Sequence, residues 1–529
     1  MANAEHFENG VEPIAIIGMG CRWPGEAGSD SDVDTPNALW EYLLAKKNSY
    51  SDFPSSRVNL ESWYHPETGR PGSFYTRGGC FLNEDPRQFD PTFFGINPQE
   101  ATSLDPAQRK ILEVVYETLE SAGATLETLS GSKTGVFVGN FNYDHQLMQY
   151  RDTEYPEPYG ISGGGIALLS NRINYVFNLH GPSLTLDTAC SSSMYALHLA
   201  CVSIQSGECT AAIVGGSNLI FTPECQIFSA SLGAVSKSSR CQTFDAAADG
   251  YARADGIGAL YIKPLKQAIL DNDPIRAVIR GTAINANGRT GGITHPDPDG
   301  QEAAIRRAYE RAGNLDPNET FYFECHGTGT PVGDPLEVEA IGKLRRASVN
   351  SFGYGGANAH AIIESIEHFS PGRGGVRALK EERDYSGLAN GDKSQLKPHR
   401  NGTNGTYGIN NTNGTNGTNG TNGTNGAKAT NGQSLLPRRQ FLLAFSAHNE
   451  ATLKQNVAAF RDQAGGYDVL DLAYTLGCRR SKLASRTYTV ASQGTLVDSL
   501  DVEGLTISKA IGSRNLSLGF VFTVGSDGS

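Results

Sequence analysis

The chain has 529 residues, of which 38% are apolar and 19% charged, a composition typical of a soluble globular protein with two or three domains. Its 44 basic and 56 acidic residues give a net charge of −12, and no apolar run approaches the ~20 residues of a membrane span, so nucleic acid and membrane partners are disfavoured. Nine cysteines without a C-x-x-C pair, and an N-terminus without an apolar signal segment, predict reduced thiols and a cytoplasmic location.

The composition changes along the chain and predicts four regions. Residues 1–12 form a polar N-terminal tail, and residues 13–366 form one long globular region. Residues 367–436 lose apolar periodicity and include an almost pure Asn-Gly-Thr repeat, which cannot bury enough surface to offset its ordering entropy. We therefore predict a flexible linker there, followed by a smaller α/β segment over residues 437–529.

Short apolar runs alternate with helical patterns throughout the large region. This alternation predicts an α/β fold with a mostly parallel sheet, and two similar series of runs suggest duplicated halves. A helix is expected over Gln301–Ala312. The predicted strands contain Ile14–Ile17, Thr134–Val138, Ala211–Val214, Ala277–Arg280 and Phe321–Glu324.

The most informative passage surrounds Cys190. Leu184 and Leu186 alternate as in a strand, and apolar residues from Met194 to Ile204 then recur at helical spacing. Cys190 is thus predicted on a strand-to-helix elbow, where the helix dipole and unpaired N–H groups would favour a thiolate and hold an oxyanion. From this passage alone, a buried structural cysteine is the alternative.

A second passage supports the chemical interpretation of Cys190. His326 directly follows an apolar run and opens a loop rich in Gly and Thr, which ends near Asp334. Loops at strand ends carry chemistry, and small residues allow a substrate to approach closely. A cysteine with a spatially close histidine is the minimal constellation for thioester chemistry, so Cys190 and His326 are the candidate catalytic pair.

These passages together resemble the β-ketoacyl synthases of the thiolase-like superfamily, specifically those of fungal, highly reducing type I polyketide synthases, which are multifunctional enzymes of secondary metabolism. Five ordered motifs carry the resemblance across residues 13–366. They lie at residues 12–25, 104–109, 187–193, 243–251 and 350–360.

The resemblance implies a thiolase-like αβαβα layered fold, usually in a homodimer. It implies that Cys190 is the nucleophile in the decarboxylative Claisen condensation of acyl and malonyl thioesters, with His326 holding the enolate oxygen. The oxyanion donors would be the backbone N–H of Cys190 and one near Phe352. The acyl groups would arrive on the phosphopantetheine arm of a separate acyl carrier protein, and the chain itself would bind no cofactor and no metal.

The chain departs from the family pattern at one place. A Lys-x-Asn-Ile-Gly-His tract, which supplies a second active-site histidine and precedes a central helix, is missing near residues 344/345. Only about twenty-five residues separate His326 from Phe352, so we expect an incomplete second half and impaired condensation. His360 is the nearby histidine, and its place in a glycine-rich strand end predicts a structural role.

The last region resembles the linker and the first elements of the acyltransferase domain that usually follows. A strand is expected at residues 518–523, and the chain then stops, which indicates truncation. Three functional alternatives remain open from the sequence: an active condensing enzyme, a remnant that loads acyl groups without extending them, and a non-enzymatic scaffold that keeps carrier-protein or dimer contacts.

Overall fold

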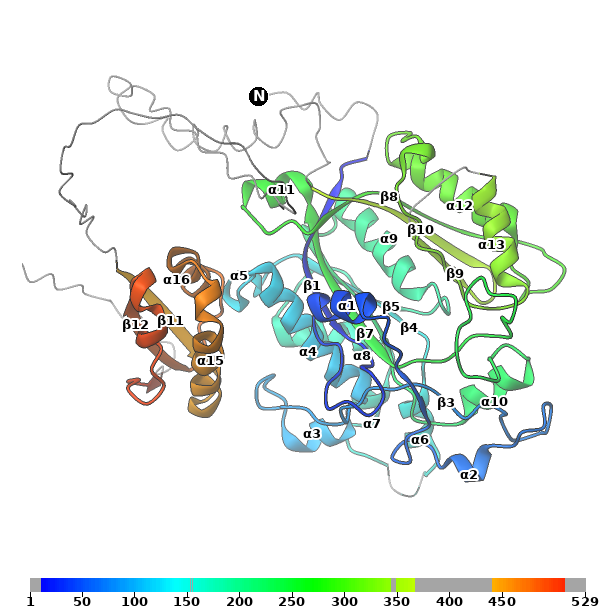
Figure 1. Cartoon of the computed structure of the whole chain (residues 1–529), viewed down its shortest axis with the longest axis horizontal. Coiled ribbons are helices and arrows are strands. Elements are labelled where there is room, and N and C mark those ends of the chain that lie inside the picture. The colour runs from blue at the N-terminus through cyan, green and yellow to red at the C-terminus, as the bar shows by residue number, and fades with distance from the viewer. Residues whose placement is uncertain (1–10, 153, 155, 344–348, 367–439, 510–529) are drawn as a thin grey trace, which may run out of the picture.

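The computed structural model describes residues 11–152, 154, 156–343, 349–366 and 440–509 (Figure 1). The junction at 344/345, the linker at 367–436 and the expected strand at 518–523 lie outside these residues. Where the chain is described, it contains no helix that is long and apolar enough to cross a bilayer.

The large body is built on an eight-stranded sheet with the order β5-β4-β6-β7-β1-β8-β10-β9. The predicted strands at residues 14–17, 134–138, 211–214 and 277–280 are confirmed. The strands are β1 (Ile14–Arg22), β4 (Thr134–Asn140), β5 (Ser183–Leu186), β6 (Ala211–Asn218), β7 (Gly256–Pro264), β8 (Ala277–Ala286), β9 (Val349–Gly353) and β10 (Ala357–Glu364), and β2 (Tyr50–Asp52) pairs with β3 (Gly78–Cys80) separately.

Helices lie between most of these strands. The predicted helix at residues 301–312 is confirmed as α12. The helices of the large body are α1 (Pro36–Leu44), α2 (Leu60–Trp63), α3 (Pro98–Ser103), α4 (Pro106–Ala122), α5 (Leu126–Leu129), α6 (Asp144–Tyr150), α7 (Gly160–Gly164), α8 (Leu168–Phe177), α9 (Ser192–Gln205), α10 (Glu224–Ser231), α11 (Leu265–Leu270), α12 (Pro298–Arg311) and α13 (Gly333–Gly342).

The prediction of a mostly parallel sheet is wrong. Only β4 is parallel to its neighbours, β5 and β6, whereas the pairings β6–β7, β7–β1, β1–β8, β8–β10 and β10–β9 are antiparallel. Both faces of the sheet are covered, so its strands read as continuous apolar runs whatever their direction. The pattern of apolar residues therefore located the strands without fixing their orientation.

The expected strand at Phe321–Glu324 does not form. Only Glu324 makes a single bridge, to Val349, where the backbone N–H of Asn350 donates to its carbonyl. Phe321 is fully exposed and Tyr322 is 66% exposed. A segment at the sheet edge that buries so little apolar surface gains too little from pairing to form a regular strand.

The sheet folds around helix α9. The five strands β5, β4, β6, β7 and β1 meet the three strands β8, β10 and β9 through three residue pairs at Ile14–Ile16. Helix α9 packs on β4 and β6 from one half and on β8 and β10 from the other, while α4 and α12 cover the two outer faces (Figure 1). This arrangement gives the five layers of the expected thiolase-like αβαβα fold.

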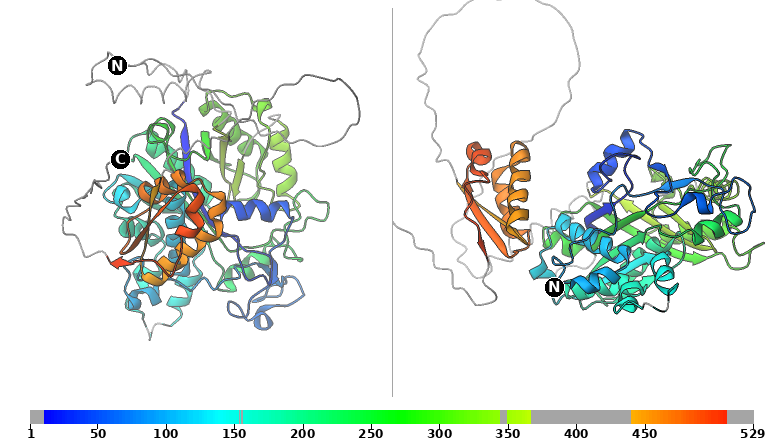
Figure 2. Two further views of the ribbon diagram at one scale, coloured as in Figure 1. Left: turned by 60° about the vertical axis from the view of Figure 1, so that its left-hand side comes forward. Right: turned by 90° about the horizontal axis from the view of Figure 1, so that it is seen from below.

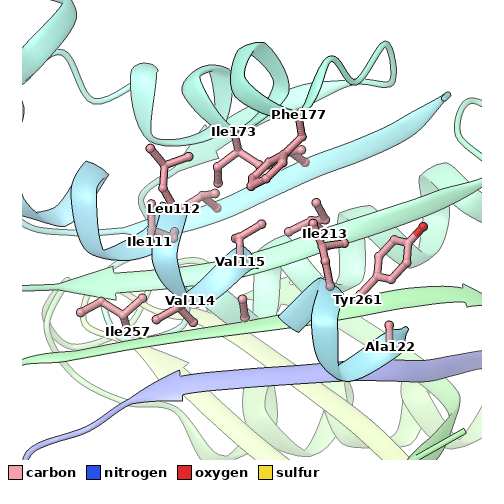
Figure 3. Close-up of a cluster of buried hydrophobic side chains, with 14 of the residues drawn as sticks. Ile111, Leu112, Val114, Val115, Ala122, Ile173, Phe177, Ile213, Ile257 and Tyr261 are labelled. Carbon is pink, nitrogen blue, oxygen red and sulfur yellow. The ribbon is translucent and has the colours of Figure 1, made fainter. Parts of the chain in front are cut away.

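The first half has its own core on the α4 side of the sheet. Ile111, Leu112 and Val115 of α4 are fully buried, with Ile173 of α8 and Ile213 of β6 beside them (Figure 3). Helix α4 comes so close to β1 that a Cβ added at Gly18 would lie 2.3 Å from the carbonyl oxygen of Thr118. Glycine in β1 therefore sets the spacing between this helix and the sheet.

A second, smaller body follows residue 440 (Figure 2). Its sheet has the order β11-β12-β13 (Phe441–Ala447, Ser485–Ala491 and Ser508–Lys509), with helices α15 (Glu450–Gln463), α16 (Val469–Cys478) and α17 (Leu496–Ser499). It contacts the α4–α5 corner of the large body, where Ser481 Oγ accepts from the Leu126 N–H at 3.0 Å and Arg480 pairs with Glu120 at 2.9 Å.

Acid should weaken the fold through His360. This residue lies buried on β10 with Nδ1 2.8 Å from Asn350 Oδ1, and burial lowers its pKa to about 3. In the unfolded chain, a histidine takes up a proton near pH 6.5, so the unfolding free energy falls by about 1.4 kcal/mol per pH unit below that value. His360→Gln should reduce this slope in urea unfolding measured between pH 7.5 and 4.5.

The matched control is His180→Gln, which removes an exposed histidine and should leave the slope unchanged. Equal slopes for His360→Gln and the wild type would show that His360 is protonated in the folded chain.

Candidate active site

Cys190 lies on the predicted elbow between β5 and α9. The turn is tight because Ala189 adopts a left-handed φ of +56°, an uncommon conformation for a residue with a Cβ. Two side chains hold the turn: Asp187 Oδ1 accepts from the Ala189 N–H at 2.9 Å, and Ser192 Oγ accepts from the Thr188 N–H at 2.8 Å. The expected strand-to-helix elbow is thus confirmed.

Cys190 is exposed as a whole residue, whereas its sulfur is partly removed from water. Burial raises the pKa of the thiol, and hydrogen bonds from the backbone N–H groups of Tyr354 and Cys190 oppose this rise only in part. Loss of water around the sulfur therefore opposes the thiolate expected at the start of α9, and that expectation stays a prediction.

The end of β9 and the turn after it contact the elbow that carries Cys190. Ser351 Oγ donates to the carbonyl oxygen of Cys190 at 3.0 Å, and a Cβ at Gly353 would lie 2.2 Å from the carbonyl oxygen of Thr188. The N–H that faces the sulfur belongs to Tyr354, two residues beyond Phe352. The buried ring of Phe352 instead packs edge-on to the ring of His326. Residues at least 161 positions apart in sequence thus meet at Cys190.

The ring of His326 packs edge-on to the ring of Phe352. Their ring centroids are 6.0 Å apart, and His326 does not border the cavity that Cys190 borders. Burial lowers the pKa of His326, although Glu337 and Asp334 act in the opposite direction, so its imidazole is neutral at neutral pH. A neutral imidazole keeps one N–H that can be donated to a substrate oxygen.

Two buried acids that the sequence analysis did not assign hold the His326 loop. Glu337 accepts from the N–H groups of His326 and Gly327 at 2.7 and 2.8 Å and from Asn350 Nδ2 at 2.9 Å. Asp334 accepts from the N–H groups of Gly329 and Phe244 at 3.0 and 2.8 Å. Asp334 and Glu337 are three residues apart on a short helix, which places both carboxylates on one face of α13. This spacing is the sequence feature that could have identified them.

Cys190 opens into a cavity of about 850 Å³ on the inner face of the sheet. Its wall is mostly apolar and comes from β1, β6, β7, α1, α9 and α10. Among the described residues of this wall there is neither a histidine nor a lysine. Residues of its floor and sides include Met19, Met194, Leu197, Phe228, Leu232 and Leu260.

The structure describes the chain on both sides of the place where the expected tract is missing. Helix α13 ends at Gly342 and β9 begins at Val349, so six residues connect them. His360, the nearby histidine, is buried against Asn350, Tyr309 and Phe323, in keeping with the structural role predicted for it. In the described part of the chain, the cavity wall therefore holds no substitute for the missing histidine.

Comparison with known families identifies two matching domains. The model for the β-ketoacyl synthase N-terminal domain matches residues 11–268, and the model for the β-ketoacyl synthase C-terminal domain matches residues 276–365. Both matches fall within the large body, and together they contain Cys190 and His326.

Similar full-length proteins are fungal. The chain is 45% identical to a highly reducing polyketide synthase of Aspergillus nomiae and 48% identical to one of Pyrenophora dematioidea, each match covering 97% of this chain. The chain spans about a fifth of the length of these relatives, 22% and 21%. The Aspergillus alignment runs over 599 residues against 529 in the whole chain, so at least 70 aligned positions of the relative have no counterpart here.

Solved structures with the same fold include bacterial ketosynthases. An oxazolomycin ketosynthase domain of Streptomyces albus has a TM-score of 0.73 and 26% identity, covering 96% of this chain and 91% of that one. The ketosynthase from module 6 of the bacillaene synthase of Bacillus subtilis has a TM-score of 0.70 and 27% identity, covering 92% and 84%. Each alignment covers a larger share of this chain than residues 11–366 make up.

The thiol of Cys190 should react slowly at neutral pH. Since its pKa is raised above the ordinary value of 9.0, the rate of alkylation by iodoacetamide should still be rising at pH 9. The measurement is the pH profile of Cys190 modification, followed by peptide mass spectrometry. A plateau reached by pH 8 would show that the thiolate is stabilised instead.

Removing the carboxylate of Glu337 should destabilise the His326 loop. Glu337→Ala leaves the partly buried N–H groups of His326 and Gly327 without an acceptor, at a cost of about 2–4 kcal/mol. Urea unfolding measures the loss. Glu339→Ala on the same helix removes an exposed ion pair with Lys343 and should change stability by less than about 1 kcal/mol. Equal effects would contradict the role of Glu337.

Proposed function

The chain belongs to the β-ketoacyl synthase family, and from this premise we propose that it is the ketosynthase region of a polyketide synthase, with Cys190 as its nucleophile. The reaction would be a decarboxylative Claisen condensation of acyl and malonyl thioesters. The observation that carries the proposal is the strained elbow at Cys190, with the backbone N–H groups of Cys190 and Tyr354 at its sulfur.

In the first step, the Cys190 thiolate attacks the carbonyl carbon of an acyl thioester. A new C–S bond forms, the bond to the carrier sulfur breaks, and the proton lost from Cys190 ends on the departing thiol. Donors aimed at the tetrahedral oxyanion are usually the largest contribution to such a step. The N–H groups of Cys190 and Tyr354 are the candidates, and Tyr354 takes the place expected for a donor near Phe352.

In the second step, a malonyl thioester loses carbon dioxide and the resulting enolate attacks the acyl–Cys190 carbonyl. A new C–C bond forms, the C–S bond to Cys190 breaks, and the Cys190 thiolate is restored. The neutral imidazole of His326 would donate its N–H to the enolate oxygen. This requires the ring of Phe352 to move or the thioester to pass it, because that ring packs on His326. Because the described cavity wall holds no histidine and the tract that carries the second one is missing, we infer that extension is much slower than loading.

The partners follow from the same chemistry. Acyl groups would be presented on the phosphopantetheine arm of an acyl carrier protein, since a cavity of this size admits an extended thioester. Homodimer formation is supported by β5, the outermost strand of the sheet, where Leu184 is 41% exposed. An uncovered edge strand offers unpaired backbone groups to a second copy.

A remnant or scaffold is the second candidate. It is favoured by the connection between α13 and β9, whose six residues, 343–348, do not contain the tract that carries the second histidine. In that case, the chain keeps carrier-protein or dimer contacts but has lost either the extension step or both the loading and the extension steps.

Loading and extension can be measured separately. Incubation of the full chain with a butyryl thioester of N-acetylcysteamine should add one butyryl group, detected by intact mass spectrometry. Cys190→Ala should abolish the adduct, because the attacking sulfur is gone, and Cys478→Ala, an exposed cysteine of the smaller body, should not. Adding a malonyl thioester should yield extended product at least about 100-fold more slowly than loading.

Each possible result decides between the alternatives. Extension as fast as loading would establish an active condensing enzyme. A well-folded chain that forms no adduct on Cys190 would leave the scaffold as the remaining function.

A further inference from the structure

Unpaired polar atoms gather in the wall of the Cys190 cavity. Arg253, which is 6% exposed, has no hydrogen-bond partner at either Nη1 or Nη2 in the described chain. Ser217 Oγ and Asn218 Oδ1, at the end of β6, also lack partners, and both residues border the same cavity. A cluster of unpaired polar atoms therefore interrupts an otherwise apolar wall.

A buried guanidinium without a partner is costly. Removing such a charge from water costs several kcal/mol unless an anion and further hydrogen bonds compensate it. The position of Arg253 is fixed at its backbone, because its carbonyl accepts from the Cys80 N–H at 3.0 Å and Asn218 Nδ2 donates to the next carbonyl, of Ala254, at 2.6 Å. The charge is therefore held beside the cavity rather than left free to reach solvent.

The acids nearest to Arg253 in sequence or in the cavity wall make no hydrogen bond to its Nη atoms in the described chain. Asp255 pairs with Arg57 at 3.1 Å, with both side chains almost fully buried. Glu224, the acid of the cavity wall, pairs with Arg151 through Oε1, and its Oε2 has no partner among the described residues. Asp249 Oδ2 accepts from the N–H of Lys237, and its Oδ1 likewise has no described partner. A ligand anion at Arg253 therefore competes only with a movement of Glu224 or Asp249.

Arg253 and Cys190 face the same ligand space. Both border the cavity, and Tyr251, which also borders it, lies within electrostatic reach of the Cys190 thiol and of the Arg253 guanidinium. A ligand whose thioester carbon lies at Cys190 therefore occupies a space that Arg253 borders. A planar guanidinium favours a carboxylate, which it can bind through two parallel hydrogen bonds.

We propose that Arg253 binds the carboxylate of a malonyl-type acyl group in the Cys190 cavity, with Ser217 and Asn218 beside it. The proposal rests on the proposed function, since that reaction supplies a thioester with a free carboxylate. Arg253 acts in binding only: it neutralises the carboxylate on entry, and a neutral acyl chain, which lacks a carboxylate, gains nothing from it. The site thus distinguishes the extender unit from the acyl group that is loaded.

The test uses inert ligands on the full chain. The malonyl amide of N-acetylethylenediamine carries the carboxylate, and the acetoacetyl amide is its neutral counterpart of similar size; neither can acylate a thiol. Each is titrated against iodoacetamide alkylation of Cys190. In the wild type, the malonyl amide should protect Cys190 at about tenfold lower concentration than the acetoacetyl amide.

Variants assign the preference to Arg253. Arg253→Gln should abolish the tenfold difference, and Arg253→Lys should keep part of it because the charge is retained. Arg307→Gln, which removes an exposed arginine of α12, should behave as the wild type does. If Arg253→Gln fails to fold, as judged by its unfolding midpoint, Arg253→Lys against the wild type decides: a full tenfold preference with lysine would overturn bidentate binding.

Other outcomes are equally decisive. An equal effect of both amides, or a preference that survives in Arg253→Gln, would overturn the proposal. Protection by acetate or sulfate as strong as by the malonyl amide would reveal a general anion site and overturn it as well. Butyryl loading of Cys190, measured in parallel, tests the proposed function separately: loading can fail while Arg253-dependent protection persists, and the reverse.

Discussion

The structure depends on the burial of α9 between the two halves of the sheet. This helix is apolar on nearly all sides, as expected for one enclosed by two layers, and its small residues Ala196 and Ala200 are fully buried. Polar contacts tie it to the second half, where His198 Nδ1 lies 2.8 Å from Thr282 Oγ1 and the Tyr195 hydroxyl donates to the Asn285 carbonyl at 2.6 Å. Cys190 owes its position to this helix.

The site is assembled from segments that are far apart in sequence and meet at β9. Ser351 and Gly353 of β9 support the elbow, and Phe352 between them contacts His326. Glu337 links the His326 loop to β9 through Asn350. Because all these contacts involve one strand, displacement of β9 would disturb the sulfur environment and the His326 loop together.

The wall of the cavity has a large apolar part and one charged part. Its apolar surface suits an acyl chain by burial alone. The unpaired guanidinium of Arg253 gives it one place that favours charge. An apolar pocket with a few placed polar groups is the usual form of a site that orients its ligand.

The sequence by itself determined the local features of this protein. Apolar spacing located β1, β4, β6, β8, α9 and α12, and the elbow at Cys190 followed from a strand pattern that changed to a helical one. Motifs identified the family, and the missing tract was visible as a short spacing between His326 and Phe352. Such features depend on residues that are neighbours in the chain.

Only the tertiary structure decided the features that depend on distant residues. Strand direction, the loss of the strand at Phe321–Glu324 and the raised pKa of the Cys190 thiol all come from what packs against each segment. The same is true of Tyr354 as the donor at the sulfur and of Arg253 as an unpaired charge. Desolvation and pairing are set by the whole environment of a group, which spacing along the chain does not encode.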